Sequence, residues 1–156
     1  MPEATGEPAA SWAMDTLEIT DAFGRAVPIS LRYNTGFMDS TVRARVVDRV
    51  TFFWRFEEDP LRGAGGPSPE LEAGLADMEA AIIEAIPGDG GSLVAVRLGN
   101  GMVEYAVAFF SEAAHERFAE HFEPPAAFFN KFAAQSFDHG HTFWPEYLPQ
   151  GFEAEG

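Results

Sequence analysis

The sequence predicts an α+β fold: a ferredoxin-like βαββαβ two-layer sandwich with an additional N-terminal β-hairpin. Two observations lead to this prediction, a strong hairpin signal in the middle of the chain and an amphipathic helix pattern on each side of it. The chain has 156 residues, a length that suits one domain. Residues 1–14, rich in Pro, Ala and Glu, are expected to form a flexible tail, and residues 15–156 the single domain.

The central hairpin covers residues 92–110. Two alternating runs meet at Asn100 and Gly101, a pair that favours a type I′ turn because both central residues of that turn have positive φ. A two-residue turn gives one apolar face and one face with a cross-strand charge pair. The predicted pairs are Leu98 with Val103, Val96 with Tyr105, Val94 with Val107, Arg97 with Glu104 and Ala95 with Ala106.

Both predicted helices have a capping signal and an apolar stripe. The first begins at Ser68-Pro69-Glu70, which combines a capping hydroxyl, a proline and an acid. The second begins after Ser111 and ends before Pro124-Pro125. Their stripes, at helical spacing, are Leu71, Leu75, Met78, Ile82 and Ile86 in the first helix, and Ala114, Phe118 and Phe122 in the second.

The remaining strands are predicted from alternation. Residues 16–21 and 27–33 are expected to form the N-terminal hairpin, and residues 34–40 a loop. A long strand over residues 46–56 has Arg49, Thr51 and Arg55 on one face, and on the other Val46, Val50, Phe52, Trp54 and Phe56. Residues 135–139 form a final strand, and residues 144–148 an aromatic turn against the core. The sheet face without helices is expected to be polar.

Composition limits the function classes. Acids outnumber bases 25 to 10, for a net charge of −15, which argues against direct binding of nucleic acid. An acidic surface suits a basic partner, although charge also serves solubility alone. No cysteine is present, which excludes disulfides and thiolate metal sites. No apolar run has the roughly 18 residues of a membrane span, and the acidic N-terminus is unlike a signal peptide. A cytoplasmic protein with no membrane contact is therefore expected.

The segment around His139 and His141 contains the candidate metal ligands. In an extended strand, side chains two residues apart share a face about 7 Å apart along the chain, so the two imidazoles could bind one metal ion. Glu146 or a residue from elsewhere would supply a third ligand. The alternative is that both histidines are surface or partly packed side chains.

The sequence contains no recognisable catalytic motif, and it predicts neither an enzyme nor a bound cofactor. The acidic run at residues 57–59 reads as a solvated charge run, and the glycine-rich segments 63–66 and 88–91 lack the lysine of a P-loop. Aromatic residues of the sheet could stack on RNA bases, but their expected burial and the net charge argue against it. They are Phe52, Trp54, Tyr105 and Phe109.

Several segments resemble a family of bacterial proteins of unknown function, which is similar in layout to the regulator of ribonuclease E activity B. They are residues 12–33, TFFWRFE, ELEAGLADMEAAIIEAI, GNGMVEYAVAF and HTFWPEYLP. The resemblance spans about residues 12–149 and implies a ferredoxin-like fold and the binding of another protein. It implies no catalytic residues. The His139-Gly140-His141 segment departs from the pattern.

The leading functional hypothesis is a non-catalytic domain that binds another protein, one with basic character, in the manner of a regulator or inhibitor. The alternative is a small-ligand or metal-binding module that uses His139 and His141 together with Trp144 and Tyr147. Homodimerisation through a sheet edge remains open. The expected contact surface is the sheet face or edge without helices, together with the acidic outer faces of the two predicted helices: Glu72, Asp77, Glu79, Glu84, Glu112, Glu116 and Glu120.

Overall fold

The computed structural model describes residues 12–20, 23–55, 69–99, 101–128, 132–137 and 147–148. Their strands form one six-stranded sheet in the order β1-β2-β4-β5-β3-β6, and every neighbouring pair is antiparallel. The architecture is therefore α+β, as the sequence predicts. The elements are β1 (Trp12–Thr20), β2 (Ala26–Asn34), η1 (Thr35–Met38), α1 (Ser40–Arg43), β3 (Asp48–Arg55), α2 (Pro69–Ala85), β4 (Gly91–Gly99), β5 (Met102–Phe109), α3 (Glu112–His121), η2 (Ala126–Phe128) and β6 (Ala133–Phe137).

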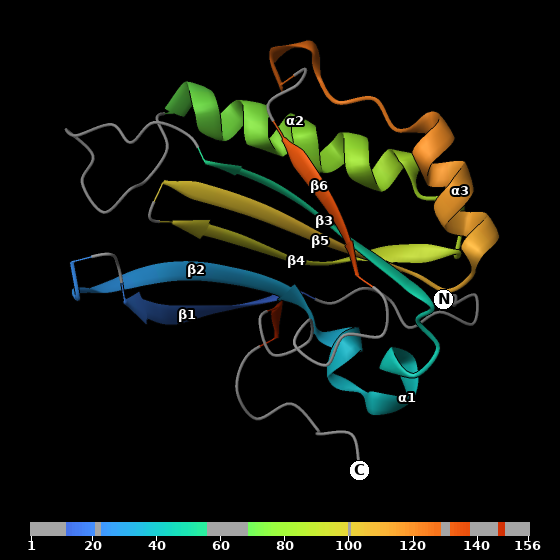
Figure 1. Cartoon of the computed structure of the whole chain (residues 1–156), viewed down its shortest axis with the longest axis horizontal. Coiled ribbons are helices and arrows are strands. Elements are labelled where there is room, and N and C mark those ends of the chain that lie inside the picture. Colours follow the sequence, from blue (N-terminus) through green and yellow to red (C-terminus); the bar gives the residue numbers. More distant parts are fainter. Residues whose placement is uncertain are drawn as a thin grey trace.

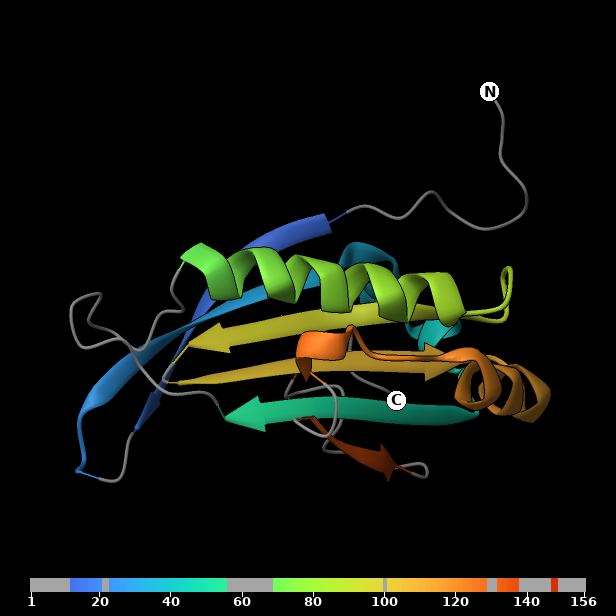
Figure 2. The same ribbon diagram turned by 90° about the horizontal axis from the view of Figure 1, so that it is seen from above.

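The two longer helices lie on one side of the sheet and α1 lies on the other (Figure 1). Seen from above, α2 runs along the length of β4, and α3 lies at the end of the sheet where β5 ends (Figure 2). In the described part of the chain no helix is both long enough and apolar enough to cross a bilayer.

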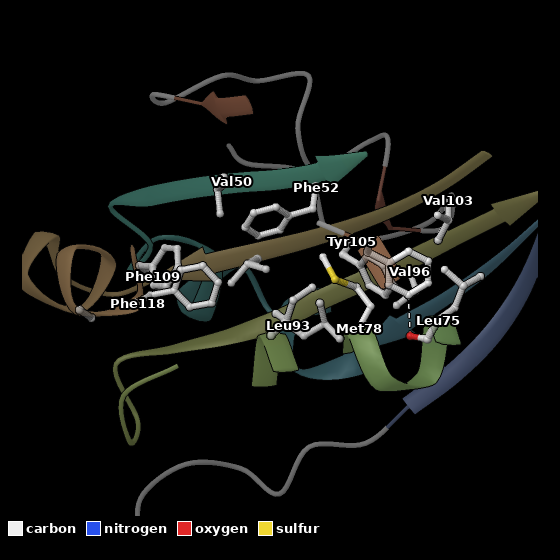
Figure 3. Close-up of a cluster of buried hydrophobic side chains, with 14 residues drawn as sticks. Val50, Phe52, Leu75, Met78, Leu93, Val96, Val103, Tyr105, Phe109 and Phe118 are labelled. Atoms are coloured by element: carbon white, nitrogen blue, oxygen red, sulfur yellow. Dashed lines mark hydrogen bonds between the residues drawn. The ribbon is translucent and has the colours of Figure 1, made fainter. Parts of the chain in front are cut away.

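A first apolar cluster fills the space between the sheet and the two longer helices (Figure 3). The helix stripes are confirmed, because Leu75, Met78 and Ile82 of α2 are buried, as is Phe118 of α3. The predicted cap is also present, since the Ser111 side chain accepts a hydrogen bond from the backbone N–H of Ala114. We call this set of residues the helix-side cluster.

The predicted hairpin register is confirmed near the turn and wrong farther from it. Leu98 pairs with Val103, and Val96 pairs with Tyr105, on either side of a two-residue turn. A bulge between Leu93 and Ala95 then shifts the register, so Val107 pairs with Leu93 instead of the predicted Val94. The extra residue of a bulge turns its side chain away from the alternating pattern, and Val94 accordingly lies, fully buried, on the opposite face.

That opposite face is not the polar surface that the sequence predicts. A second apolar cluster covers it, in which Phe37, Tyr147 and Leu148 pack over small residues of the central strands. We call this set the far-side cluster. Arg49 and Thr51, expected on a solvent face, are only 5% and 3% exposed. The predicted alternation is correct for β3, but both of its faces are buried.

Part of this cover comes from residues 34–40, which were predicted as a loop and instead contain η1 and the start of α1. The Asn34 side chain accepts from the N–H of Gly36 at 2.9 Å and caps η1. Asp39 caps α1 in the same way, by accepting from the N–H of Thr41. Asn and Asp favour such caps because their short side chains reach a backbone donor two residues on.

Several strands have ends that differ from the predicted ones, most clearly β1, β3 and β6. β1 begins at Trp12, inside the segment expected to be a tail, while β3 begins at Asp48 and β6 covers Ala133–Phe137. The whole of β1 pairs with β2, from Trp12 opposite Asn34 to Thr20 opposite Ala26. Backbone pairing with a neighbour, which a local pattern does not report, extends the strand into a sequence with little alternation of its own.

Candidate functional site

A groove of about 360 Å³ lies between α2 and the β1–β2 hairpin, on the helix side of the sheet. Its apolar lining comes from Leu75 of α2 and from β4 and β5, through Val96, Leu98, Val103 and Tyr105. Ala76 also lines it, and this short side chain leaves space between the helix and the hairpin. The outer wall includes Met14, which is 70% exposed, so the groove opens on the surface.

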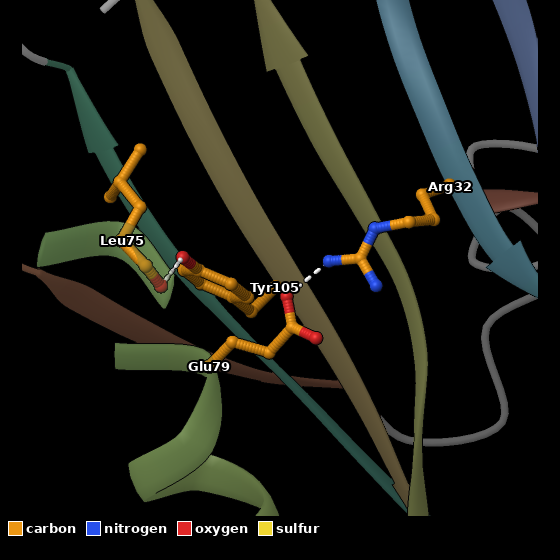
Figure 4. A network of polar contacts seen from close by, with 4 residues as sticks. All are labelled: Arg32, Leu75, Glu79 and Tyr105. Atoms are coloured by element: carbon orange, nitrogen blue, oxygen red, sulfur yellow. Dashed lines mark hydrogen bonds and ion pairs between the residues drawn. The ribbon is translucent and has the colours of Figure 1, made fainter. Parts of the chain in front are cut away.

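Charged side chains cross one part of this groove. Arg32 of β2 forms an ion pair with Glu79 of α2, and both side chains are partly buried, at 34% and 21% exposure (Figure 4). The Arg32 guanidinium also lies 5.2 Å from the centre of the Trp12 ring. Such cation–π contacts favour a cation held over the face of an indole. Arg32 is thus held between the helix and the first strand.

Beneath the ion pair, the Tyr105 hydroxyl donates a 2.8 Å hydrogen bond to the backbone carbonyl of Leu75. Burial raises the pKa of Tyr105 far above its ordinary value, and the negative charge of Glu79 acts in the same direction. A buried phenol resists ionisation because its charged form would lose its hydration. Tyr105 is therefore a neutral donor that ties α2 to β5 at the inner end of the groove.

The predicted protein-binding acids lie where the helix pattern places them, on the outward surfaces of α2 and α3. Glu79 is the exception, since it is half-buried and bound to Arg32. Glu72 lines the groove together with Glu79, so the structure brings two of the seven residues to one site. The six exposed acids are Glu72, Asp77 and Glu84 on α2, and Glu112, Glu116 and Glu120 on α3.

The candidate metal ligands His139 and His141 lie outside the described residues, as does Glu146. Within the described residues, no group of three or more His, Asp or Glu side chains is arranged to hold a metal ion. His115 has a structural setting: its Nδ1 lies 3.3 Å from Asp48 Oδ2, and its ring stacks on Phe109 with centroids 4.6 Å apart.

The predicted charge pair of the central hairpin is present on the far side of the sheet. Arg97 Nη1 lies 3.1 Å from Glu104 Oε1, and the Tyr147 hydroxyl donates to the other carboxylate oxygen at 3.0 Å. The Arg97 guanidinium also lies 5.7 Å from the centre of the Tyr147 ring. Of the residues proposed to form a ligand pocket around the C-terminal segment, Tyr147 alone lies in the described part, and there it belongs to the far-side cluster.

The aromatic residues considered for base stacking are packed against the helices. Phe52, Tyr105 and Phe109 are at most 8% exposed, and Trp54 packs against the same cluster with its ring 5.4 Å from that of Phe128. A ring that stacks on a base must offer an open face. The expected burial is confirmed, and these rings are core residues.

The sequence did not reveal the groove. Met14, Ser30 and Arg32 share one face of the N-terminal hairpin, and this mixture of apolar and polar side chains was the available signal. Its neighbour could not be inferred, because the contact between β2 and β4 depends on the order of strands in the sheet. A local sequence pattern indicates which face of a strand is polar, but it does not indicate which strand lies beside it in the sheet.

Comparisons of the chain with protein-family models, with curated proteins and with solved structures gave no match. The expected family resemblance therefore stays a prediction.

Proposed function

We propose that this protein is a non-catalytic regulator or inhibitor that acts in the cytoplasm by binding a basic segment of another protein. The observation that carries the proposal is the placement of the seven predicted acids: six are exposed on α2 and α3, and the seventh, Glu79, faces the groove. The proposed activity requires no catalytic residues, because the acidic surface needs only to attract and bind the partner.

The charged residues of these two helices are almost all acidic. The α2 sequence contains no lysine or arginine, and in α3 Arg117 is the single arginine, with no lysine. The chain as a whole carries a net charge of −15. Charge of one sign, gathered on one side of a protein, speeds the approach of an oppositely charged partner and disfavours partners of like charge. A basic protein segment is therefore the favoured partner.

A fold assignment accompanies this proposal, the ferredoxin-like sandwich extended by an N-terminal hairpin. Its support is the order β4-β5-β3-β6 within the sheet, with β3 antiparallel to both of its neighbours and a helix in each crossover. This is the arrangement expected of two split βαβ units. The resemblance to the ribonuclease E regulator points to the same class of activity, binding and restraining another protein.

A quantitative pull-down tests the function. The immobilised protein is exposed to an extract of its source cells at about 50 mM and about 500 mM salt, concentrations between which exposed charge attraction is largely screened. We expect a basic protein that is retained at low salt and released at high salt. A variant with Glu112→Gln, Glu116→Gln and Glu120→Gln, and a second with Glu72→Gln, Asp77→Asn and Glu84→Gln, identify the helix involved.

The control is a variant that neutralises exposed acids elsewhere, Asp15→Asn with Glu18→Gln on β1. It should retain the partner as well as the unmodified protein does. If neither helix variant lowers retention relative to this control, the acidic helix surfaces are not the binding site and the proposal is wrong.

A further inference from the structure

We infer that the groove beside α2 binds an apolar side chain of the partner segment, with an arginine or lysine next to it in the partner's sequence. The inference rests on the proposed function and adds to it the place and the chemistry of recognition. Exposed acids give attraction without much specificity, whereas a shaped apolar groove selects a side chain.

The lining of the groove specifies the apolar part of the ligand. Leu75, Val96 and Val103 offer aliphatic surface in a volume of about 360 Å³, near the lower end of the range of about 300–1,000 Å³ typical of ligand sites. A leucine, methionine or phenylalanine side chain fits within this volume together with part of the segment that carries it. The Tyr105 hydroxyl donates a hydrogen bond to the Leu75 carbonyl, so Tyr105 offers the groove mainly the surface of its ring.

The charges around the groove specify the neighbouring residue. Its lining holds two acids, Glu72 and Glu79, and one base, Arg32. Both acids belong to α2, whose sequence contains no lysine or arginine. The lining thus contains one more acid than base, on a helix without basic side chains, and this balance favours a cationic side chain beside the inserted apolar one and disfavours an acidic one.

The exposure of the walls favours a segment of a protein over an enclosed small molecule. Met14 is 70% exposed and Ala76 is also exposed, so the groove is open to a chain that passes across its mouth. A second copy of this chain could offer similar chemistry through the tip of its N-terminal hairpin, where Phe23 is 82% exposed and lies beside Arg25. The charge of −15 on each copy opposes that association.

Three short peptides used as probes test the inference: acetyl-Arg-Leu-Arg-amide, acetyl-Arg-Gly-Arg-amide and acetyl-Glu-Leu-Glu-amide. Methyl resonances are followed by NMR during titration. The first peptide should shift the methyl groups of Leu75, Val96 and Val103, and the other two should leave them in place. If the two arginine peptides bind equally and the groove methyls do not move, the groove is not the site while the acidic surface still is. If no arginine peptide binds, the proposed function fails as well.

Two matched variants locate the binding. Ala76→Phe fills the mouth of the groove from an exposed helix position, and Ala119→Phe adds the same ring to an exposed position on α3 away from it. We expect Ala76→Phe to weaken binding of the Arg-Leu-Arg peptide by about tenfold or more, and Ala119→Phe to leave it unchanged. Equal affinities in the two variants would overturn the inference, and the methyl titration of the unmodified protein stands even if a variant folds poorly.

Analytical ultracentrifugation of the unmodified protein tests whether a second copy of the chain, instead of a basic partner, fills the groove. We expect a monomer at concentrations where the peptide binds. Self-association that Phe23→Ala and Ala76→Phe each abolish would show that the hairpin tip of another copy fills the groove, and would replace a basic partner by a homodimer.

Discussion

Both faces of the central strands β3, β4 and β5 are largely buried, yet they are covered in different ways. On the helix side, α2 and α3 pack through large side chains. The centre of the Phe118 ring, for example, lies 5.9 Å from that of Phe52 and 5.3 Å from that of Phe109. On the far side the strands present small residues, and short non-strand segments cover them. The small far-side residues are Ala95, Ala106 and Ala108.

The difference reflects what each kind of cover requires. A helix satisfies its own backbone hydrogen bonds and needs only large apolar side chains to fill the space between it and the sheet. A short irregular segment has carbonyl groups that still need donors when buried. Arg43, only 3% exposed, supplies one by donating to the Phe37 carbonyl at 2.8 Å. The far side therefore buries charged side chains such as Arg43, whereas the residues of the helix-side cluster are apolar apart from the Tyr105 hydroxyl.

The largest expected effect tests the helix side. Phe109 is fully buried and contacts both Phe118 and His115. Phe109→Ala should lower the free energy of unfolding by about 3–5 kcal/mol, because it removes a large buried side chain and leaves a cavity. Urea denaturation measures the change. Phe23→Ala, at an exposed position, should change stability by less than about 0.5 kcal/mol, and similar losses in both variants would contradict the assignment of Phe109 to the core.

The next effect tests the far side. Arg43→Met keeps an unbranched stem but removes the donor to the Phe37 carbonyl, and a buried acceptor without a partner costs about 1–3 kcal/mol. Denaturation should show this loss. Arg45→Met is the matched control, since Arg45 is exposed and its guanidinium lies 4.7 Å from the centre of the Phe110 ring. If Arg45→Met costs as much as Arg43→Met, the buried hydrogen bond is not what distinguishes the far side.

A pH experiment examines Tyr105, the polar exception on the helix side. Its pKa is raised in the folded state, so the unfolded chain loses this proton first, and stability should fall as the pH rises above about 10, the ordinary value for tyrosine. Tyr105→Phe should cost about 0.5–1.5 kcal/mol at neutral pH through the lost hydrogen bond, and should show a smaller alkaline decline. Parallel declines in the two proteins would indicate that another group is responsible.

The smallest effect concerns the charge pair of the far side. A double-mutant cycle with Arg97→Met and Glu104→Gln should give a coupling energy of about 0.2–1 kcal/mol, as for other cross-strand pairs. Their side chains are 16% and 14% exposed, which limits screening by salt. A coupling energy of zero would mean that the contact of Tyr147 with Glu104, and not the ion pair, holds this part of the far side.

The sequence predicted the elements better than their surroundings. The stripe that includes Met78 and Ile82 and the turn at Asn100 and Gly101 are local signals, and the helices and the near-turn register followed from them. The bulge at Val94 could not be predicted, because the run Leu93-Val94-Ala95-Val96 is apolar throughout and does not say which side chain faces which cluster. Burial of Arg49 was missed for a similar reason: its charge indicated solvent, and the strands on either side of it, β5 and β6, are distant in the chain.

Of the candidate site, the exposed acids were predictable and the groove was not. Glu72 and Glu79 follow from the helix period, since positions seven apart share a face. The position of Arg32 opposite Glu79 depends on β2 lying beside β4, a contact that joins distant parts of the chain. Sequence patterns thus identified the α2 wall of the groove but not the opposite wall, which the β1–β2 hairpin forms.

The position of β2 beside β4 has a consequence for how the protein is made. Ser30 of β2 pairs with Leu98 of β4, so a ribosome that adds about 5–20 residues per second needs several seconds to deliver the second strand. During that interval β2 is paired with β1 along one edge, and its other edge still lacks β4. Arg32 and Ser30, which later border the groove, occupy this waiting strand, and Pro28 removes a backbone donor from it. Arg32, which lines the groove, and Pro28 thus make this edge of a newly made hairpin a poor template for pairing with neighbouring chains.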